Sequence, residues 1–534
     1  MRSRRPWVAV RWGLLSVTLS VVIGYPVIRL GVEVLTNFAD IGASLVHHAS
    51  IRAFANTAVV AAATAVTSLL IGTAGAVVAQ RTGSRSLAAA MISPILIPPF
   101  VSALSWVDAY AGGGLTDDLF GVRWARLFGP IGVTLSIAVN AAPVVFLIVS
   151  GSLAAHRESD LVEAARASGA SAVVALRSVT LPLIRRALVG SGAVVVVLAA
   201  NAYGVPAVLG LPAGFDTITT LIHRELAFSA DAAAFNRAVA LSMVLMILAA
   251  ALATRVERPT ARTPVPVGGL APHRVHSRHR RSAALLWGYW TAAVLVPLVA
   301  LVLRAIVRAP GLDPIPAHWT LDHFRTAWTS LAVEAATNSV LLAVAAASLC
   351  VLLGGALVTV RTTRLGRYFE TVPLASFAVP GSALAVAALL AYSPRLRDTI
   401  ALVLIVYVGK FWVLAHRPLA GAVDRIPVET RLAARASGAN EREVLLRIVG
   451  PMLRPAVTGA WVLVFLFAVH ELTMSVLLFG PGSETLATVT LNLRQLGDSA
   501  ATSALAVTMT VGVVALGAPL FFGWKTRRRV VTTP

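Results

Sequence analysis

The seven-residue string AARASGA occurs twice in this chain of 534 residues, at 164–170 and at 433–439. Each copy is followed at the same distance by a proline, Pro182 and Pro451, and each lies in a polar gap between long apolar runs. Because the spacing is about half of the chain length, it predicts that the protein is a tandem duplication. Both copies retain a loop, and loops carry function more often than core positions do.

The apolar runs predict a membrane protein. Hydrophobic residues make up 57% of the chain and charged residues 13%, and the mean hydropathy is +0.80, values far from those of a soluble domain. A helix that spans a bilayer needs ~20 apolar residues. We therefore predict an all-α, polytopic membrane protein with about 12 transmembrane helices in two parallel six-helix repeats, centred near residues 20, 66, 98, 141, 197, 244, 293, 348, 381, 408, 467 and 512.

The charge distribution predicts the orientation of these spans. The formal net charge is +21, and nearly all of the basic excess falls in the two termini, the middle of the chain and the loops after spans 2, 4, 8 and 10. Such a bias marks the cytoplasmic side of an inner or plasma membrane, so we expect both termini in the cytoplasm, the lipid bilayer as a partner and no nucleic-acid partner. The first apolar run follows Arg2, Arg4 and Arg5 and matches the run at 283–303, which favours a span over a cleaved signal peptide.

Two transmembrane units, 1–254 and 283–534, are predicted to flank a cytoplasmic linker at 255–282. The linker is rich in Pro, Gly, Arg and His, a composition that cannot support a packed core. We interpret its histidines as part of a basic segment attracted to anionic headgroups and not as a metal site. They are His273, His276 and His279.

Three further pairs of similar segments extend the duplication beyond the repeated string. They are Asn56-Thr57 and Asn338-Ser339, IPPFVSAL at 97–104 and VPGSALAV at 379–386, and the segments 208–222 and 477–491. An even number of spans per half means that the two copies run parallel and are related by an axis along the membrane normal. Both copies of the repeated loop therefore face the same compartment, as a two-fold symmetric partner requires.

The two loops, at 158–187 and 427–456, are predicted to fold as short helix–turn–helix elements across the cytoplasmic mouth. In each loop an alanine- and arginine-rich helix stops at a glycine, Gly169 or Gly438, because glycine can take a positive φ and turn the chain. A second short helix follows, and the proline after it is expected to begin the next span, where a missing N–H is tolerated. Small residues allow another protein to approach closely, and arginines offer charge-assisted contacts. The arginines are Arg166, Arg177, Arg435 and Arg447.

EAARASGA followed by LP resembles the EAA loop of binding-protein-dependent ABC importer permeases, in which this loop forms the coupling helix that docks into the nucleotide-binding subunit. The resemblance covers essentially the whole chain and identifies it as two six-span permease units fused into one polypeptide. In the second copy Leu432 replaces the family's glutamate, which implies that one half couples less tightly than the other. The resemblance implies ATPase-coupling roles for Glu163, Ala164, Ala165, Arg166, Gly169, Pro182, Ala433, Ala434, Arg435, Gly438 and Pro451.

The resemblance also implies the partners. An ATP-binding-cassette ATPase dimer is expected to bind the two loops, and an extracytoplasmic substrate-binding protein is expected to deliver the substrate. Lys410 and Lys525 are the only lysines, and neither belongs to a glycine-rich phosphate loop. We therefore expect no enzyme activity and no cofactor in this chain, with ATP and Mg bound by the partner ATPase. Cys350 is the only cysteine and lies in an apolar run, so we also expect no disulfide and no thiolate metal site.

The substrate is less constrained than the transport class. Fused permeases of this size are most similar to the ferric-iron and thiamine importers, and the segment at 470–496 resembles the ferric-iron permeases more closely. Ferric iron is therefore the expected substrate, with thiamine, polyamine and phosphonate as alternatives within the class. A secondary transporter of the major-facilitator type also has six plus six parallel spans. The expected marker of that class is a basic, acid-containing loop between the second and third spans of each half. The two loops at that position, after spans 2 and 8, are only faintly similar to each other. An integral-membrane enzyme would need clustered acids, histidines or a nucleophile, and we find no such cluster in the sequence.

Polar residues within predicted spans are candidates for the translocation pathway. His470 and Glu471 fall inside predicted span 11, and Asn201 is their counterpart in span 5. A charged residue there is costly unless it faces a cavity or a partner, so a pathway role and a structural hydrogen bond between helices both remain open. Simpler interpretations are given to the other polar positions: Asp108 reaches the outer interface, Lys410 snorkels to the cytoplasmic side, and His47-His48 lies on the surface.

Overall fold

The computed structural model describes residues 13–526, apart from residues 14, 156–157, 230, 232, 261–279, 310, 361–378 and 441–442. Within these residues all regular secondary structure is helical, and the β structure consists of one isolated antiparallel bridge between Val307 and Trp319. The prediction of an all-α protein is confirmed. The central part of the predicted linker, with its three histidines, lies outside the described residues.

The first unit is built on the long helices α4, α8, α11 and α13. Its last helix, α13, continues to Thr260, past the predicted end of the unit at 254. The helices of this unit are α2 (Tyr25–Thr36), α3 (Phe38–Val46), α4 (His48–Thr82), α5 (Arg85–Ile92), α6 (Pro99–Tyr110), α7 (Leu115–Phe120), α8 (Pro130–Ala155), α9 (Glu158–Ala167), α10 (Ala172–Ala175), α11 (Leu181–Ala200), α12 (Ile218–Ala227) and α13 (Ala234–Thr260).

The second unit repeats this order, with α17, α21, α24 and α27 in the places of α4, α8, α11 and α13. The helices of this unit are α14 (Arg280–Trp290), α15 (Val296–Ile306), α16 (Asp322–Ala327), α17 (Ser330–Val360), α20 (Gly381–Leu396), α21 (Ile400–Asp424), α22 (Val428–Ala436), α24 (Gly450–Val469), α25 (Ser475–Leu478), α26 (Leu486–Gln495) and α27 (Ser499–Thr526).

Ten helices in the described part of the chain are long and apolar enough to cross a membrane, and Arg85–Leu96 with Pro99–Phe120 forms one further pair that bends by 102°. The predicted proline-containing span near residue 98 is therefore sharply bent. The prolines between the two helices explain the bend, because a proline has no N–H and disfavours helix in the residue before it. The predicted span near residue 381 is only partly described: α20 begins after Pro380, and residues 361–378 lie outside the described part.

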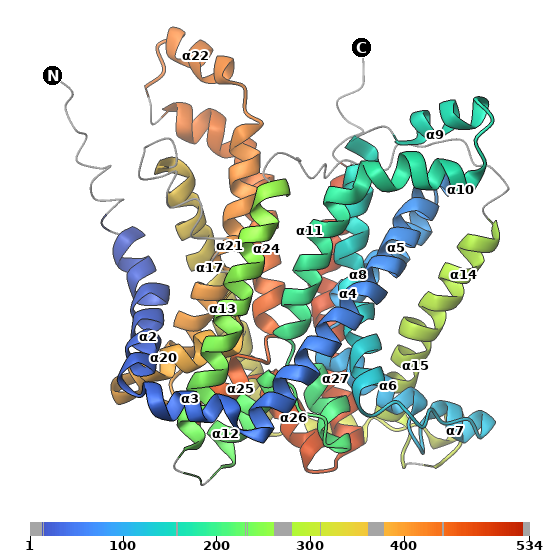
Figure 1. Cartoon of the computed structure of the whole chain (residues 1–534), viewed down its shortest axis with the longest axis vertical. Coiled ribbons are helices and arrows are strands. Elements are labelled where there is room, and N and C mark those ends of the chain that lie inside the picture. Colours follow the sequence, from blue (N-terminus) through green and yellow to red (C-terminus); the bar gives the residue numbers. More distant parts are fainter. Residues whose placement is uncertain are drawn as a thin grey trace.

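The long helices run between two ends of the molecule (Figure 1). At one end lie α9, α10 and α22, the helices of the two repeated loops, and at the opposite end lie α3, α7, α12 and α26. Helices α4, α8 and α11 pack together in the first unit, as α17, α21 and α24 do in the second. The repeated loops thus lie at the same end, as the parallel arrangement of the two units predicts.

The first helix of each unit packs against the other unit. Helix α2 lies against α20, and α15 lies against α6 as well as against α27 of its own unit. The largest cluster of buried apolar residues accordingly contains residues of both halves, among them Phe100 and Leu472. The two sequence units are therefore not separate bodies, because each half completes the packing of the other.

A π turn widens the first helix of each unit, at Ser20–Gly24 and at Thr291–Leu295. A proline stands two residues beyond each turn, Pro26 and Pro297. A proline ring inside a helix has no N–H to donate and presses against the carbonyl four residues earlier. A π turn relieves this crowding by widening the helix, and it leaves carbonyl groups for donors from outside the helix.

Two repeat-related tyrosines supply those donors. The hydroxyl of Tyr392 donates to the carbonyl of Val21 at 2.6 Å, and the hydroxyl of Tyr110 donates to the carbonyl of Ala292. Each tyrosine belongs to one unit, and each carbonyl belongs to the first helix of the other. An equivalent hydrogen bond therefore holds the first helix of each unit against the other unit, and both copies of the duplication retain it.

Candidate functional site

The repeated string folds into a helix cap. We call residues 158–180 the first elbow and 428–449 the second elbow, each with a coupling helix, α9 or α22, at its start. In the first elbow the N–H of Gly169 donates to the carbonyl of Arg166 and the N–H of Ala170 donates to the carbonyl of Ala165, both at 3.0 Å. This pair of bonds is a Schellman cap, which satisfies carbonyls left open at a helix end.

The second elbow has the same cap. The N–H of Gly438 donates to the carbonyl of Arg435 at 3.0 Å, and the N–H of Ala439 donates to the carbonyl of Ala434 at 3.1 Å. The glycines have φ of +90° at Gly169 and +83° at Gly438, so the prediction that both helices end by turning at a glycine is confirmed. A Cβ added at either glycine would meet no atom within 4 Å, which means that the backbone angle, and not space, requires glycine.

The helices of both elbows lie at one end of the molecule (Figure 1), and their exposed side chains include small and charged ones. Glu163, Ala164 and Arg166 are exposed in the first elbow, and Ala433 and Arg435 are exposed in the second. A chain that ends a helix with a rigid cap can hold such side chains in a fixed geometry, as a docking surface requires.

The elbows differ at one position on this surface. Leu432 is 58% exposed where the first elbow has the carboxylate of Glu163. The alanine two residues after this position faces inward: Ala165 is half-buried, and Ala434 is buried beside Val444 and other apolar residues of the second elbow. The second elbow therefore exposes an apolar side chain where the first exposes a negative charge.

Pro182 and Pro451 stand at the second residue of α11 and α24, as predicted, but the helical backbone does not begin there. Apolar helices run through both prolines, at Val173–Ala200 and at Leu446–Val469. A π turn lies immediately before each proline, as it does in the first helices of the units, at 176–180 and 444–449. The widened turn accommodates the proline, so each elbow is joined to α11 or α24 without an interruption of the helix.

The far ends of α11 and α24 are helix breaks. We call residues 201–205 and 470–474 the first and second break, because α11 ends at Ala200 and α24 ends at Val469. Asn201 and His470 are the equivalent first residues of these segments. The prediction that His470 lies inside a span is therefore wrong, since the helix ends before it.

Both of these residues hold a buried polar atom that has no hydrogen-bond partner within the described structure, Oδ1 of Asn201 and Nδ1 of His470. Unpaired buried polar atoms are costly and rare. Each break therefore begins with a buried polar atom that has no partner within the described structure.

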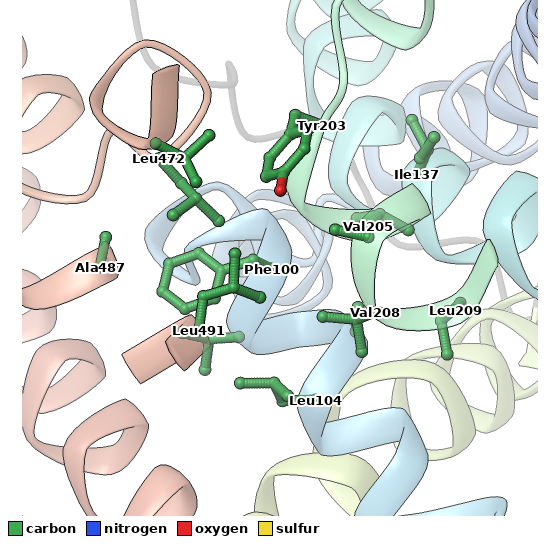
Figure 2. Packing of buried hydrophobic residues seen from close by; sticks show 14 of the residues in the cluster. Phe100, Leu104, Ile137, Tyr203, Val205, Val208, Leu209, Leu472, Ala487 and Leu491 are labelled. Atoms are coloured by element: carbon green, nitrogen blue, oxygen red, sulfur yellow. The ribbon is translucent and has the colours of Figure 1, made fainter. Parts of the chain in front are cut away.

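The two breaks meet at a neck, which we define as Phe100, Tyr203, Gly204 and Leu472. The side chains of Phe100, Tyr203 and Leu472 belong to one buried apolar cluster (Figure 2), and the backbone of Gly204 lies against Phe100 and Leu472. Phe100 is the second residue of α6, Tyr203 and Gly204 belong to the first break, and Leu472 belongs to the second. A Cβ at Gly204 would lie 2.6 Å from Cβ of Phe100 and 3.1 Å from Cδ2 of Leu472, so glycine is needed for close approach. The neck thus packs residues of both units together.

Glu471 lies beside the neck, and one of its oxygens, Oε1, accepts from the N–H of Met474 at 2.8 Å. Lys410 of α21 donates from Nζ to the carbonyl of Val379 at 2.6 Å. The prediction that Lys410 snorkels to the cytoplasmic side is wrong, because its ammonium group bonds to a backbone carbonyl inside the protein.

Asp108 does not lie at the membrane interface as predicted. Its side chain is 5% exposed, with Oδ1 at 3.7 Å from Nε of Arg304, and its Oδ2 accepts from the hydroxyl of Ser503 at 2.7 Å. Asp108 belongs to the first unit, whereas Arg304 and Ser503 belong to the second. A buried carboxylate needs partners of this kind, so the pair is a polar contact between the units.

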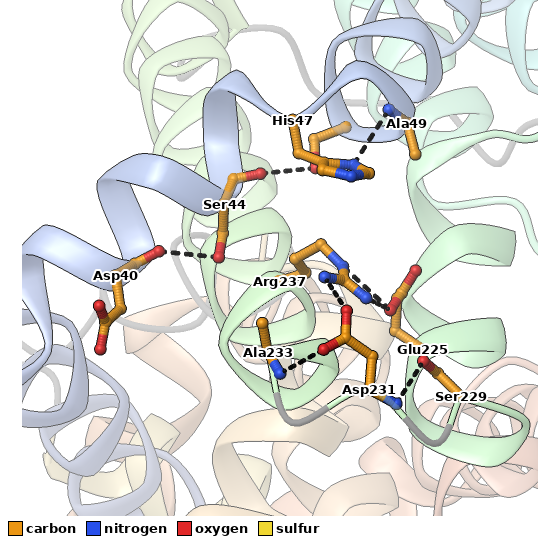
Figure 3. Close-up of polar contacts among 10 residues, drawn as sticks. Asp40, Ser44, His47, Ala49, Glu225, Ser229, Asp231, Ala233 and Arg237 are labelled. Atoms are coloured by element: carbon orange, nitrogen blue, oxygen red, sulfur yellow. Dashed lines mark hydrogen bonds and ion pairs between the residues drawn. The ribbon is translucent and has the colours of Figure 1, made fainter.

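The end of the molecule opposite the elbows has an ion network in the first unit (Figure 3). Arg237 donates to Glu225 at 2.6 Å and to Asp231 at 2.7 Å. The N–H of Ala233 and the guanidinium of Arg237 hold the pKa of Asp231 below its ordinary value. His47 is exposed, as predicted, and its Nδ1 accepts from the N–H of the residue two positions later, at the start of α4.

A cavity of about 460 Å³ adjoins this network. It is lined by Asp40, Ala43, Ser44, His47, Ala233, Asn236 and Arg237. Among the described residues, no group of three or more His, Cys, Asp and Glu side chains is arranged to hold a metal ion.

Comparison with known proteins decides the family. The model of the family described as "Binding-protein-dependent transport system inner membrane component" matches residues 68–262 and again residues 339–527. The chain belongs to this family. The two matches correspond to the two units, so the permease carries the family element twice and is a multi-pass inner membrane protein, as its ten apolar helices also indicate.

Two ferric transport proteins are similar to the permease. It is 22% identical over 406 residues to the Fe(3+)-transport system permease protein FbpB 2 of Haemophilus influenzae, with 74% of each chain covered. It is 24% identical over 463 residues to the ferric transport system permease protein FbpB of Actinobacillus pleuropneumoniae, with 81% of this chain and 64% of that protein covered. The predicted resemblance to binding-protein-dependent permeases, and within them to the ferric-iron group, is confirmed.

Sequence reasoning found the elbows of the permease but not its neck. Neither Phe100 nor Leu472 differs from the many apolar residues around it in the sequence, so no local pattern marks them. Lys410 did carry a signal, since it is the only lysine within an apolar run. That signal was assigned to the wrong surroundings, because the sequence does not reveal which backbone group the ammonium reaches.

Proposed function

We propose that this permease is the translocating subunit of an ABC importer that moves ferric iron across the inner membrane. An ATPase dimer binds the two elbows from the cytoplasm and holds ATP and Mg, and an extracytoplasmic binding protein delivers the iron. The chain itself catalyses no reaction and holds no cofactor. The observation that carries the proposal is the pair of identically capped, exposed elbows at one end of a duplicated permease. Both termini and the linker lie on the side of the elbows, which the excess of basic residues supports.

Movement of the elbows is transmitted to the neck. Closure of the ATPase dimer on ATP draws Glu163, Ala164 and their counterparts in the second elbow together. Each elbow continues through its π turn into α11 or α24, and those helices end at the two breaks. A rigid helix transmits a displacement along its length, so movement of the elbows separates or closes the breaks and switches access between the two sides.

The breaks provide the translocation pathway. Asn201, His470 and Glu471 offer an oxygen, an imidazole nitrogen and a carboxylate at the neck, and Phe100 with Leu472 closes it when no substrate passes. Side chains of these types are ligands of iron. The names of the two relatives, both ferric transport permeases, support iron over thiamine, polyamine or phosphonate.

The docking role is tested by Gly169→Glu and Gly438→Glu. Since a side chain at either position points into open space, each variant should insert into the membrane normally, release the ATPase in co-purification and abolish uptake. Gly169→Asn is the control, because asparagine tolerates a positive φ and is smaller. Unchanged uptake in both glutamate variants would refute the assignment of the elbows.

Reconstitution tests the transport class and the substrate. Proteoliposomes that contain the permease and its ATPase should take up radiolabelled ferric iron from the loaded binding protein only when ATP is present on the elbow side. Uptake driven by an ion gradient without the ATPase would refute the importer class. Uptake of thiamine, a polyamine or a phosphonate in place of iron would refute the substrate alone.

A further inference from the structure

Equivalent bonds in the two units define which residues correspond. The hydroxyl of Ser68 donates to the carbonyl of Ala138, and the thiol of Cys350 donates to the carbonyl of Val408. The same helix pair, α4 with α8 and α17 with α21, makes this contact in each unit. The register that it sets places Lys410 of α21 at the position of Asn140 in α8.

The breaks align in the same way. The N–H of Ala202 donates to a carbonyl three residues earlier, Ala199, and the N–H of Glu471 donates to the carbonyl of Ala468. Glu471 therefore stands where the first unit has Ala202. The second unit thus has a lysine and a glutamate at the two positions where the first unit has asparagine and alanine.

The lysine and the glutamate belong to one assembly. The hydroxyl of Tyr407 donates to the carbonyl of Glu471 at 3.3 Å and bonds to the hydroxyl of Ser475 at 2.6 Å, which fixes α21 against the second break. Lys410 lies on the same face of α21, since residues three apart in a helix are neighbours. Its ammonium group donates to the carbonyl of Val379, two residues before α20 begins, on the face of α21 that Tyr407 holds against the second break.

The first unit shows that the fold does not require these charges. There the amide of Asn140 donates to the carbonyl of Ser136 in its own helix, and Ala202 has no carboxylate. The same framework is thus built with neutral side chains. Charges inside a membrane protein are costly when unpaired and usually mark a pathway, so the pair in the second unit has a use beyond packing.

The position of the pair indicates that use. Glu471 is the neighbour of Leu472, which contacts Phe100 and Gly204 of the first unit at the neck. A substrate that passes between the two breaks therefore comes within reach of the carboxylate. His470, with its unpaired Nδ1, lies next to it in the same break.

We propose that Glu471 is the cation contact of the neck and that Lys410 is its resident counter-ion. A cation that enters the neck binds the carboxylate, while the ammonium group stays on the carbonyl of Val379. When the cation leaves, the positive charge of the nearby ammonium group offsets the charge of the empty carboxylate. This inference rests on the proposed transport function and names the substrate class of the same neck, a cation and not an anion such as a phosphonate.

The test measures uptake of radiolabelled iron from the loaded binding protein in proteoliposomes with the cognate ATPase. Glu471→Gln should lower the iron taken up per ATP hydrolysed at least tenfold. Lys410→Asn leaves the carboxylate without its counter-ion, so the cation should be held longer: both KM and the maximal rate of uptake should fall at least fivefold. A higher KM with an unchanged maximal rate in Lys410→Asn would overturn the proposal.

The double variant Lys410→Asn with Glu471→Ala carries the residues of the first unit and separates function from folding. It should reach the membrane in wild-type amounts and melt at the wild-type temperature, yet remain at least tenfold impaired in uptake. Recovery of uptake to within twofold of wild type would show that the pair is structural and would overturn the proposal.

The cargo that the wild-type permease takes up shows whether this inference has failed or only the proposed substrate has. If the wild type moves another cationic cargo, the assignment of iron fails, and the same variants measured with that cargo still decide the role of the pair. An anionic cargo overturns the inference directly.

Discussion

A graded series of substitutions at the elbow glycines tests whether the backbone angle is the reason that glycine stands at these positions. Gly169 has φ of +90°, and a Cβ there meets no atom within 4 Å. Gly169→Ala therefore adds no clash, and its cost is that of an L-residue in the left-handed region, ~1–2 kcal/mol. That cost lowers the ratio of formed to unformed cap by a factor of about 5–30.

The series distinguishes this cause from helix propensity and from size. Asparagine adopts a positive φ more readily than alanine, so the expected order of cap stability is glycine, then asparagine, then alanine. Helix propensity alone predicts the opposite order for the last two. Gly459→Ala in α24 is the matched control, because that glycine also has open space around it but lacks a positive φ; alanine there should be neutral or stabilising by about 0.5–1 kcal/mol.

Amide hydrogen exchange of residues 168–170 in the purified permease measures the effect. Exchange should accelerate by about 5- to 30-fold in Gly169→Ala and by less in Gly169→Asn, and retention of the ATPase should follow the same order. The series at Gly438 is an independent repeat, since its cap has the same bonds. Alanine that protects the cap as well as glycine does, or better than asparagine does, would refute the argument.

Other contacts of the structure give three more expected outcomes. Tyr392→Phe removes the donor to the π turn of α2 and should lower the free energy of unfolding by about 0.5–1.5 kcal/mol; an unchanged melting temperature in detergent would contradict the docking role of this bond. Asp108→Ala removes the carboxylate beside Arg304, which is partly exposed and keeps its bond to the carbonyl of Gly113, and should cost about 1.5–3 kcal/mol. Ser503→Ala should cost about 1 kcal/mol, and equal melting temperatures for the two variants would show that the ion pair adds nothing. Leu432→Glu adds the carboxylate that the second elbow lacks and should tighten ATPase binding about fivefold, or ~1 kcal/mol. The control is Leu446→Glu, an equally exposed position outside α22, which should leave ATPase binding unchanged. The same gain in both variants would refute a specific contact.

The local structure of the elbows could be predicted because it depends on adjacent residues. The bonds of each cap connect positions no more than five residues apart, and only glycine takes the required φ without strain. Seven identical residues therefore produce the same cap twice. The prolines were harder to interpret: the sequence marks a proline in a helix, but whether the helix breaks, as it does before Pro99, or widens, as it does before Pro182, depends on the packing around it.

By itself, the sequence determined that this chain is a duplicated, all-helical membrane protein whose two elbows lie on the same side. Composition, apolar periodicity and a repeated string suffice for that, because each acts over a short stretch of chain. Only the tertiary structure decided that the first helix of each unit packs against the other unit, that Asp108 meets Ser503 across a separation of 395 residues, and that Lys410 bonds to the carbonyl of Val379. These contacts bring together distant segments, and a charge in an apolar run shows that it needs a partner without showing which one the fold provides.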